Sequence, residues 1–308
     1  MDPRILFTFL SQNKVETISG SNLLDFFFFV RLMAIHMDLP VTTGDIFFAR
    51  PGSWPEHEKP YTLLYDPTED VPLSNFKVSD IQPVPIRDMR PKKETLSIHR
   101  EGFIFADFES QLTYEDYFDE SKLRSVLAEE IRQLLIDRLG VKACFIHECV
   151  FRRRDSGPSA DGNVGSPVPE AHTDYTLNYA HKLIGELARS DADLIRTRKF
   201  QMINVWKPLR GPLRDWPLAL CDYSTLNRDD LVPVDEVHRE GILESHSIQY
   251  NPSQKWYYLS DQTPNEVLIF RSVDSVIYGE VPHAAFCDPR YPNESPRESV
   301  ELRVLVVY

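Results

Sequence analysis

The sequence predicts a mainly β protein with flanking helices, arranged as a double-sheet jelly roll. Many short strand-like runs follow one another in the C-terminal half, and only two segments have the spacing expected of helices. Many strands with few helices are typical of sandwiches and barrels. A jelly roll is the member of this class that brings early and late strands together around one mouth.

The N-terminal third differs from the rest in composition. Residues 38–96 are rich in proline, charge and aromatic side chains, which predicts an irregular arm with short strands. We expect an arm of residues 1–95 packed on a core of residues 96–308, within one structural domain. The apolar run Phe26–Val30 is too short to span a bilayer, and no signal peptide is evident. We expect this run to be buried or to face a partner.

Two helices and a series of strands are expected in the core. Apolar residues recur at helical spacing over residues 117–139, and Gly140 stands where a helix C-cap belongs. Residues 176–188 can form a second helix. The strand-like runs are Ala143–Arg152, Phe200–Trp206, Leu218–Cys221, Ser247–Tyr250, Lys255–Leu259, Glu266–Phe270, Ser275–Tyr278 and Ser299–Val307. The turn Asn251–Ser253 predicts a hairpin between two of them.

Residues 155–169 are rich in glycine, serine and proline and predict a flexible loop. The loop ends directly before His172, so it is placed to act as a lid over a site there. The alternative is a plain surface insertion.

Charge and cysteine content exclude several classes of function. The chain has 47 acidic and 34 basic residues, a net charge of −13. Such a surface repels nucleic acid and anionic membranes, so we expect a small-molecule substrate and neither of those partners. The four cysteines have no metal-binding or disulfide-framework spacing, which favours a reduced, cytoplasmic location. Phosphate-loop and serine-nucleophile motifs are absent from the sequence.

One pattern of residues predicts a metal centre. His172 and Asp174 stand two residues apart, and His283 lies far downstream in the apolar run Val281–Phe286. Side chains two apart on a strand point to one face, and a charged imidazole in an apolar setting is costly without a partner. Two imidazoles and one carboxylate on one face of an ion form the facial triad of non-haem Fe(II) oxygenases. We therefore predict His172, Asp174 and His283 as the metal ligands and catalytic centre.

A candidate anion site follows the last of these residues. Arg297 and Ser299 share one face of the final strand-like run, while the alternate valine and leucine residues form the other face. A guanidinium is a planar, permanently charged fork that suits a carboxylate-bearing co-substrate. Arg303, on the same face, is a competing anchor, and Glu301 is an alternative partner for an arginine. Asn204, on an earlier strand, is a further candidate for co-substrate binding, with packing as its other role.

At these residues the sequence resembles a known family. It is similar to the hydroxylase/desaturase group that includes the cephamycin 7α-methoxylation component, gibberellin desaturase-like proteins and many fungal biosynthetic oxygenases. The matching segments are His172–Thr176, Asn204–Leu209, Asp215–Asp222, Trp256–Tyr258, Asp261–Val267 and Pro296–Arg303. The resemblance covers residues 95–308. One departure is Lys207, where the family often has arginine.

The resemblance implies a cupin-like double-stranded β-helix that uses Fe(II), 2-oxoglutarate and O2. It implies His172, Asp174 and His283 as iron ligands, and hydroxylation, desaturation or cyclisation of a small secondary-metabolite intermediate. Two alternatives stay open: an iron oxidase that uses O2 without 2-oxoglutarate, and a non-catalytic jelly-roll subunit of a heteromeric oxygenase. A homo- or hetero-dimer is also left open.

Overall fold

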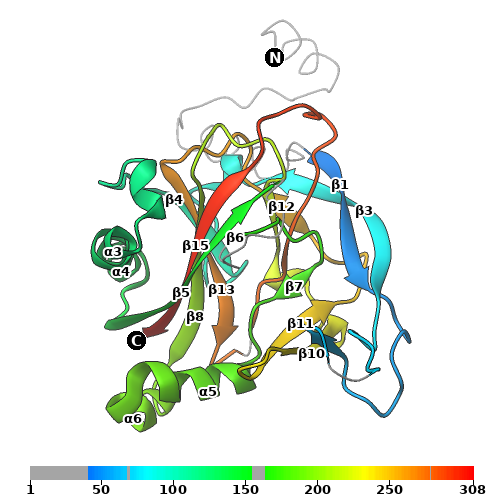
Figure 1. Ribbon diagram of the computed structural model, residues 1–308. Coiled ribbons are helices and arrows are strands. Elements are labelled where there is room, and N and C mark those ends of the chain that lie inside the picture. The colour runs from blue at the N-terminus through cyan, green and yellow to red at the C-terminus, as the bar shows by residue number, and fades with distance from the viewer. Residues whose placement is uncertain (1–40, 68–69, 155–163, 278) are drawn as a thin grey trace, which may run out of the picture. The chain divides into compact units, whose positions relative to one another are not determined.

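The computed structural model describes residues 41–67, 70–154, 164–277 and 279–308. Two sheets face each other, with helices at the periphery, which confirms the mainly β jelly-roll prediction (Figure 1). In spatial order the first sheet contains β1 (Val41–Ala49), β3 (Val78–Asp88), β12 (Trp256–Tyr258), β9 (Leu218–Cys221), β14 (His283–Ala285), β7 (His172–Thr173), β11 (Ile242–Ile248), β10 (Leu231–Val237) and β2 (Tyr61–Leu63). The second contains β4 (Phe103–Asp107), β13 (Glu266–Asp274), β8 (Phe200–Pro208), β15 (Glu298–Val307), β5 (Ala143–Arg153) and β6 (Val164–Gly165).

The final strand, β15, carries the predicted alternation. Val300, Leu302, Val304 and Val306 pack in one apolar cluster with α4 (Ala128–Leu139). Ser299, Glu301 and Arg303 therefore point to the other face, toward the first sheet. The neighbouring strand β8 divides its side chains in the same way. The six-stranded sheet thus has an apolar outer face. Its inner face is polar around Ser299, Glu301 and Arg303 and apolar at the other end, where Met202 and Leu305 pack together.

The expected long helix is interrupted. A 3-10 turn over Glu115–Phe118 ends at Asp119, whose side chain accepts the Ser121 amide and caps α3 (Glu120–Lys122). A π-helical turn then joins α3 to α4, and Gly140 ends α4 at φ 65°, as predicted. The second expected helix is α5 (Leu177–Ala188), followed by the short α6 (Ala192–Arg196).

The prediction of an irregular arm with short strands over residues 38–96 fits the described residues between 50 and 77, where β2 has three residues, but it was wrong for the segments on either side. β1 and β3 are long strands that pair antiparallel in the nine-stranded sheet. Pro83 and Pro85 are tolerated inside β3 because their nitrogens point toward the side of β12. Met89, an even number of residues further along the chain, shows this direction, because it donates its amide to the carbonyl of Tyr258 on β12. β12 itself pairs only with the last three residues of β3. The proline nitrogens therefore face a stretch that has no partner strand.

Two local predictions also failed. Asn251–Ser253 is a turn, but it joins β11 to β12, which do not pair with each other, so there is no hairpin. Ser275–Ile277 is a turn rather than a strand, because the Asp274 carboxylate accepts the amides of Val276 and Ile277. The apolar run Phe26–Val30 and residues 155–163 of the predicted lid lie outside the described residues.

Lys207, the departure from the family pattern, lies on the outer face of β8. Its ammonium donates to the Tyr117 hydroxyl at 2.7 Å and stands over the Phe108 ring. Burial lowers the pKa of Lys207 to about 8, from an ordinary value of 10.5. The side chain therefore belongs to the helix-covered face and not to the polar inner face.

This buried lysine leads to a pH-dependent stability. Between pH 8 and 10.5 the unfolded chain binds the Lys207 proton that the folded chain has lost, so the cost of burying this lysine shrinks with pH across this window. We expect Lys207→Met to stabilise the protein at pH 7 by on the order of 3 kcal/mol, and this gain over the wild type to shrink toward pH 10. Urea unfolding of both proteins at pH 7 to 10 measures the difference, with the exposed Lys77→Met as control. A difference between Lys207→Met and the wild type that does not change with pH contradicts the assignment.

Candidate metal centre and anion pocket

Two short strands bring the predicted histidines together. β7 and β14 are neighbours in the nine-stranded sheet, and their one registered pair is His172 with His283. The two ring centres are 4.3 Å apart. Asp174 directly follows β7 and turns toward the same point. Residues more than a hundred positions apart in the chain thus meet because both lie on adjacent strands.

The three side chains form a compact donor set. One ligand atom from each of His172, Asp174 and His283 lies within 4.8 Å of the others. Asp174 Oδ1 is 4.0 Å from His172 Nε2, and Asp174 Oδ2 is 3.7 Å from His283 Nε2. Ligands side by side on one ion at about 2.1 Å are about 3 Å apart, so the three side chains need to close by only about 1 Å to share an ion. Two imidazoles and one carboxylate are also the donor set that suits Fe(II).

Both imidazoles are held in the tautomer that a metal requires. His172 Nδ1 lies 2.8 Å from the Glu170 carbonyl oxygen, and His283 Nδ1 lies 3.2 Å from that of Val281. A carbonyl only accepts, so each Nδ1 carries the proton and each Nε2 keeps its lone pair. Burial, followed by the neighbouring imidazole, lowers the pKa of His172 to about 4. Burial also lowers the pKa of His283. Both rings are therefore neutral near pH 7.

Asp174 is buried and kept ionised by its partners. Arg303 Nη2 lies 2.5 Å from one carboxylate oxygen, and Asn204 Nδ2 donates to the other at 2.5 Å. Burial alone would raise the pKa of Asp174, but the Arg303 charge, the two imidazoles and the Asn204 amide together hold it well below its usual range. The six-stranded sheet thus supplies the groups that orient the carboxylate of the nine-stranded sheet.

Asn204 offers a graded test of this arrangement. It is fully buried on β8, and no hydrogen bond to its side-chain oxygen is found within the described chain. Partners that orient a metal ligand typically change metal affinity by about 10- to 100-fold when removed. We expect that loss of Fe(II) affinity in Asn204→Ala. Gln201→Ala, which removes a buried amide–carboxylate contact elsewhere on β8, should leave Fe(II) affinity unchanged.

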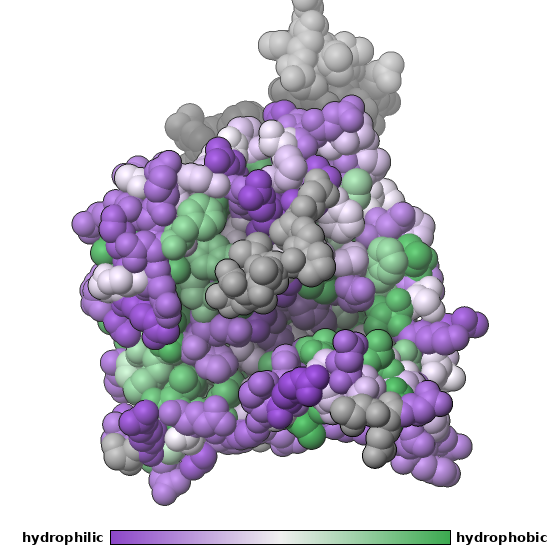
Figure 2. All heavy atoms as spheres, viewed as in Figure 1, coloured by the Kyte–Doolittle hydropathy of each residue, from purple (hydrophilic) through white to green (hydrophobic). Residues whose placement is uncertain are grey.

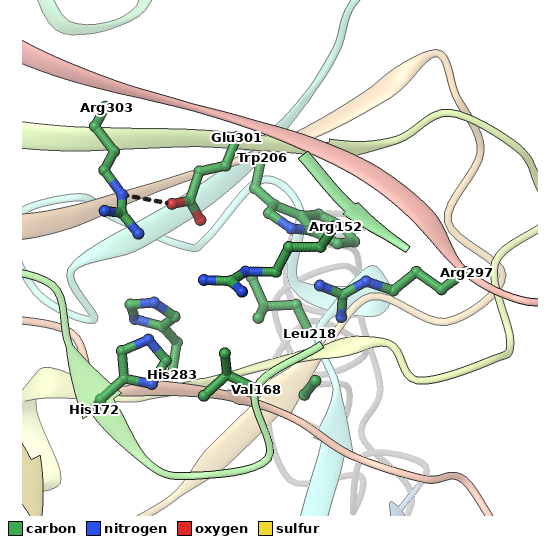
Figure 3. Close-up of a pocket in the computed structure, with 10 residues that line it drawn as sticks. Arg152, Val168, His172, Trp206, Leu218, His283, Arg297, Glu301 and Arg303 are labelled. Atoms are coloured by element: carbon green, nitrogen blue, oxygen red, sulfur yellow. Dashed lines mark hydrogen bonds and ion pairs between the residues drawn. The ribbon is translucent and has the colours of Figure 1, made fainter. Parts of the chain in front are cut away.

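A cavity lies beside the imidazoles, between the two sheets. Its volume is about 20 Å³, and its polar lining residues are Arg152, His172, His283, Arg297, Glu301 and Arg303 (Figure 3). The face of the molecule seen in Figure 1 is mostly hydrophilic and is hollowed near its centre (Figure 2). The triad and the predicted anion-binding arginines therefore share one small, strongly charged pocket.

The guanidinium groups of Arg297 and Arg303 differ in the partners that they contact. Arg303 already contacts Asp174, Glu301 at 2.9 Å and Glu148 at 3.0 Å. Arg297 is 2 % exposed; its Nε donates to Ser299 Oγ at 3.1 Å and its Nη1 to a backbone carbonyl. Among the described residues no ion pair joins the Arg297 guanidinium to a carboxylate. Burial, and then the charge of Arg152, lower the pKa of Arg297 to about 9, so a bound anion would stabilise it.

Arg152 is a pocket residue that sequence reasoning missed. It lies on β5 opposite Ser299 of β15, and its guanidinium enters the centre of the pocket (Figure 3). A charged residue inside the strand-like run Ala143–Arg152 was the available signal. The register that turns it toward Arg297 is set by pairing with a strand far away in the chain.

One known protein family matches most of the chain. A family model described as "YDMC: Oxidoreductase/YMDC permease-like domain" matches residues 46–307. In the described part of the chain, no helix is long and apolar enough to cross a membrane.

Three fungal relatives are named for related chemistry. The Fe(II)/2-oxoglutarate-dependent dioxygenase nvfI of Aspergillus novofumigatus is 27% identical over 85% of this chain and 95% of its own length. The alpha-ketoglutarate-dependent dioxygenase tstK of Talaromyces stipitatus is 30% identical over 73% of this chain and 84% of that protein. The hydroxylase/desaturase efuI of Hormonema carpetanum is 27% identical over 74% and 84%.

A solved structure agrees with the sequence relatives. The iron and alpha-ketoglutarate-dependent endoperoxidase NvfI superposes with a TM-score of 0.78 at 27% identity, over 87% of this chain and 98% of that one. The jelly-roll fold, the donor set and the relatives imply Fe(II), 2-oxoglutarate and O2 as cofactor and co-substrates. The chain belongs to the fungal Fe(II)/2-oxoglutarate-dependent dioxygenase family, and it is an oxidoreductase.

Proposed function

We propose that this enzyme hydroxylates, desaturates or cyclises a small intermediate of secondary metabolism, with His172, Asp174 and His283 as the iron ligands. The observation that supports the proposal is the compact His–Asp–His donor set beside a cavity that also contains Arg297, a buried arginine that forms no ion pair with a carboxylate of the described residues. The names of the relatives span an endoperoxidase and a hydroxylase/desaturase, so similar folds serve different outcomes. The outcome here then depends on how the substrate is placed.

Each part of the pocket has a separate task in this proposal. Arg303 and Asn204 keep Asp174 ionised and oriented, and the two backbone carbonyls keep both imidazoles neutral. Arg297 and Ser299 bind the distal carboxylate of 2-oxoglutarate through a fork and a hydroxyl.

Bound iron, together with 2-oxoglutarate and O2, supplies the oxidising power that removes hydrogen from the substrate. The chain's own contribution is placement and the exclusion of water. Val168, Leu218 and Ala285 form the apolar wall of the cavity, which limits the access of water to the reacting groups. Their size and position therefore also limit what substrate can approach the triad.

Anaerobic titration of the protein with Fe(II), with and without 2-oxoglutarate, tests the proposal. We expect a weak visible charge-transfer band that requires both components, and succinate formation once O2 is admitted. Iron binding without the band, with O2 still consumed, would instead support an oxidase that uses no 2-oxoglutarate. A purified chain that binds both but never turns over would support the non-catalytic subunit. A cytoplasmic location and a dimeric state stay predictions of the sequence.

A further inference from the structure

Arg152 stands between the triad and Arg297. In register, it faces Ser299 of β15 on one side and Gly165 of β6 on the other. Its side chain shares the inner face with Ser299, and Figure 3 shows the guanidinium directed into the pocket between the imidazoles and Arg297. After burial, the Arg152 charge is among the causes that lower the pKa of His172, His283 and Arg297. Its charge therefore acts on both ends of the pocket.

The local backbone makes room for this guanidinium. A Cβ at Gly165 would lie 2.9 Å from Arg152 Nη1, so any larger residue would displace the side chain. Nη1 donates to the Ser166 carbonyl oxygen at 3.0 Å. Within the described residues, no carboxylate forms an ion pair with Arg152, and the nearby Glu301 is taken by Arg303. Arg152 is thus a half-buried cation without a matching anion.

The described contacts hold the three pocket arginines to different degrees. Among the described residues, Arg303 contacts three carboxylates, and Arg297 contacts a hydroxyl and a carbonyl oxygen. Arg152 makes one hydrogen bond to a described residue, the Ser166 carbonyl oxygen. Arg152 is therefore the pocket arginine that can turn most easily toward an incoming acid.

We propose that Arg152 is a second cation of the co-substrate pocket, which pairs with the 2-oxo-carboxylate end of 2-oxoglutarate beside the triad. This rests on the proposed function, in which Arg297 and Ser299 bind the distal carboxylate. The acid carries two negative charges. Among the described residues, no carboxylate forms an ion pair with the guanidinium group of Arg152 or Arg297, and the two lie toward opposite ends of the pocket. On binding, the Arg152 guanidinium forms a charge-assisted contact with the acid.

Two acids distinguish the roles of the two arginines. 2-Oxopentanoate shares the 2-oxo-carboxylate end of 2-oxoglutarate but has a methyl group in place of the distal carboxylate. Binding of each acid to the anaerobic Fe(II) protein is followed by the charge-transfer band. We expect Arg152→Leu to weaken both acids by roughly 10- to 100-fold, the range for loss of a charge-assisted hydrogen bond. Arg297→Leu should weaken 2-oxoglutarate alone.

The control removes the same charge from the same strand. Arg153 follows Arg152 on β5, points to the opposite face, and has a side chain that is 61% exposed and paired with Glu298. Arg153→Leu should bind both acids as the wild type does. Arg152→Lys should recover part of the affinity, and it tests the proposal if Arg152→Leu does not fold.

Two results would overturn the proposal: Arg152 variants that bind both acids normally, or a loss confined to 2-oxoglutarate. The absence of a band in the wild-type protein would instead reject the proposed function itself. The two failures are therefore distinguishable.

Discussion

Asp174→Ala is expected to abolish Fe(II) binding while the protein stays folded. The variant removes the carboxylate of the donor set, and two neutral imidazoles alone do not hold Fe(II) in an open site. The loss should exceed the roughly 10- to 100-fold typical of residues that only orient a ligand. Arg303 keeps Glu301 and Glu148 as partners, so its buried charge is not left alone. Anaerobic Fe(II) titration and far-UV circular dichroism measure the two effects.

Asp288→Ala is the matched control for this variant. Asp288 is equally buried, but it binds Arg290 at 2.6 Å and Thr42 at 3.1 Å instead of a donor set. Its removal should lower stability and leave Fe(II) affinity unchanged. His172→Ala and His283→Ala should resemble Asp174→Ala. If Asp174→Ala keeps full iron-dependent activity, the three residues are not the metal site.

Arg297→Ala should raise the apparent KM for 2-oxoglutarate sharply. The guanidinium is buried and has no acidic partner among the described residues, so a ligand carboxylate is its natural counter-ion. Truncating one partner of a buried charge pair costs about 2–5 kcal/mol. Arg297→Lys should recover only part of the loss, because an ammonium cannot reproduce the fork. Steady-state kinetics at saturating Fe(II) provide the measurement.

Arg303→Ala distinguishes the role of Arg303, on β15, from that of Arg297, which directly precedes this strand. Arg303 contacts Asp174 directly, so its removal should weaken Fe(II) binding first and 2-oxoglutarate only in consequence. Arg297→Ala should leave Fe(II) affinity intact. A raised KM in Arg303→Ala alone, with normal iron binding, would move the anchor to Arg303. A normal KM in both variants, with substrate still oxidised, would assign Arg297 to a carboxylate of the substrate.

Short-range patterns in the sequence predicted the parts of the fold that depend on strand periodicity. The alternation of β15 was visible because one face meets an apolar helix layer and the other a polar pocket. The spacing of His172 and Asp174 also predicted that both side chains reach one point, although β7 ends at Thr173 and Asp174 lies just after it. His283 could be identified because a histidine rarely occurs inside an apolar run such as Val281–Phe286.

Long-range pairing explains what the sequence did not show. Arg152 becomes a pocket residue only through its register with Ser299, far away in the chain. Pro83 and Pro85 suggested an irregular arm because proline usually interrupts a strand. The sequence does not show that β12 ends before it reaches them, which is why β3 tolerates both prolines. Asn251–Ser253 has the composition of a hairpin turn, yet β11 and β12 each pair with other strands. Which distant strands pair with each other cannot be read from any short stretch of the sequence.

The division of the pocket between two sheets has a mechanical consequence. The imidazoles and the Asp174 carboxylate come from the nine-stranded sheet, whereas Asn204, Arg303 and Arg297 come from the six-stranded sheet or its border. A ligand that contacts residues of both sheets would link the two sheets. Its binding free energy would then stabilise the state in which the sheets are packed together. Amide hydrogen exchange should slow in β7, β14, β8 and β15 together when the pocket fills, although these strands belong to different sheets.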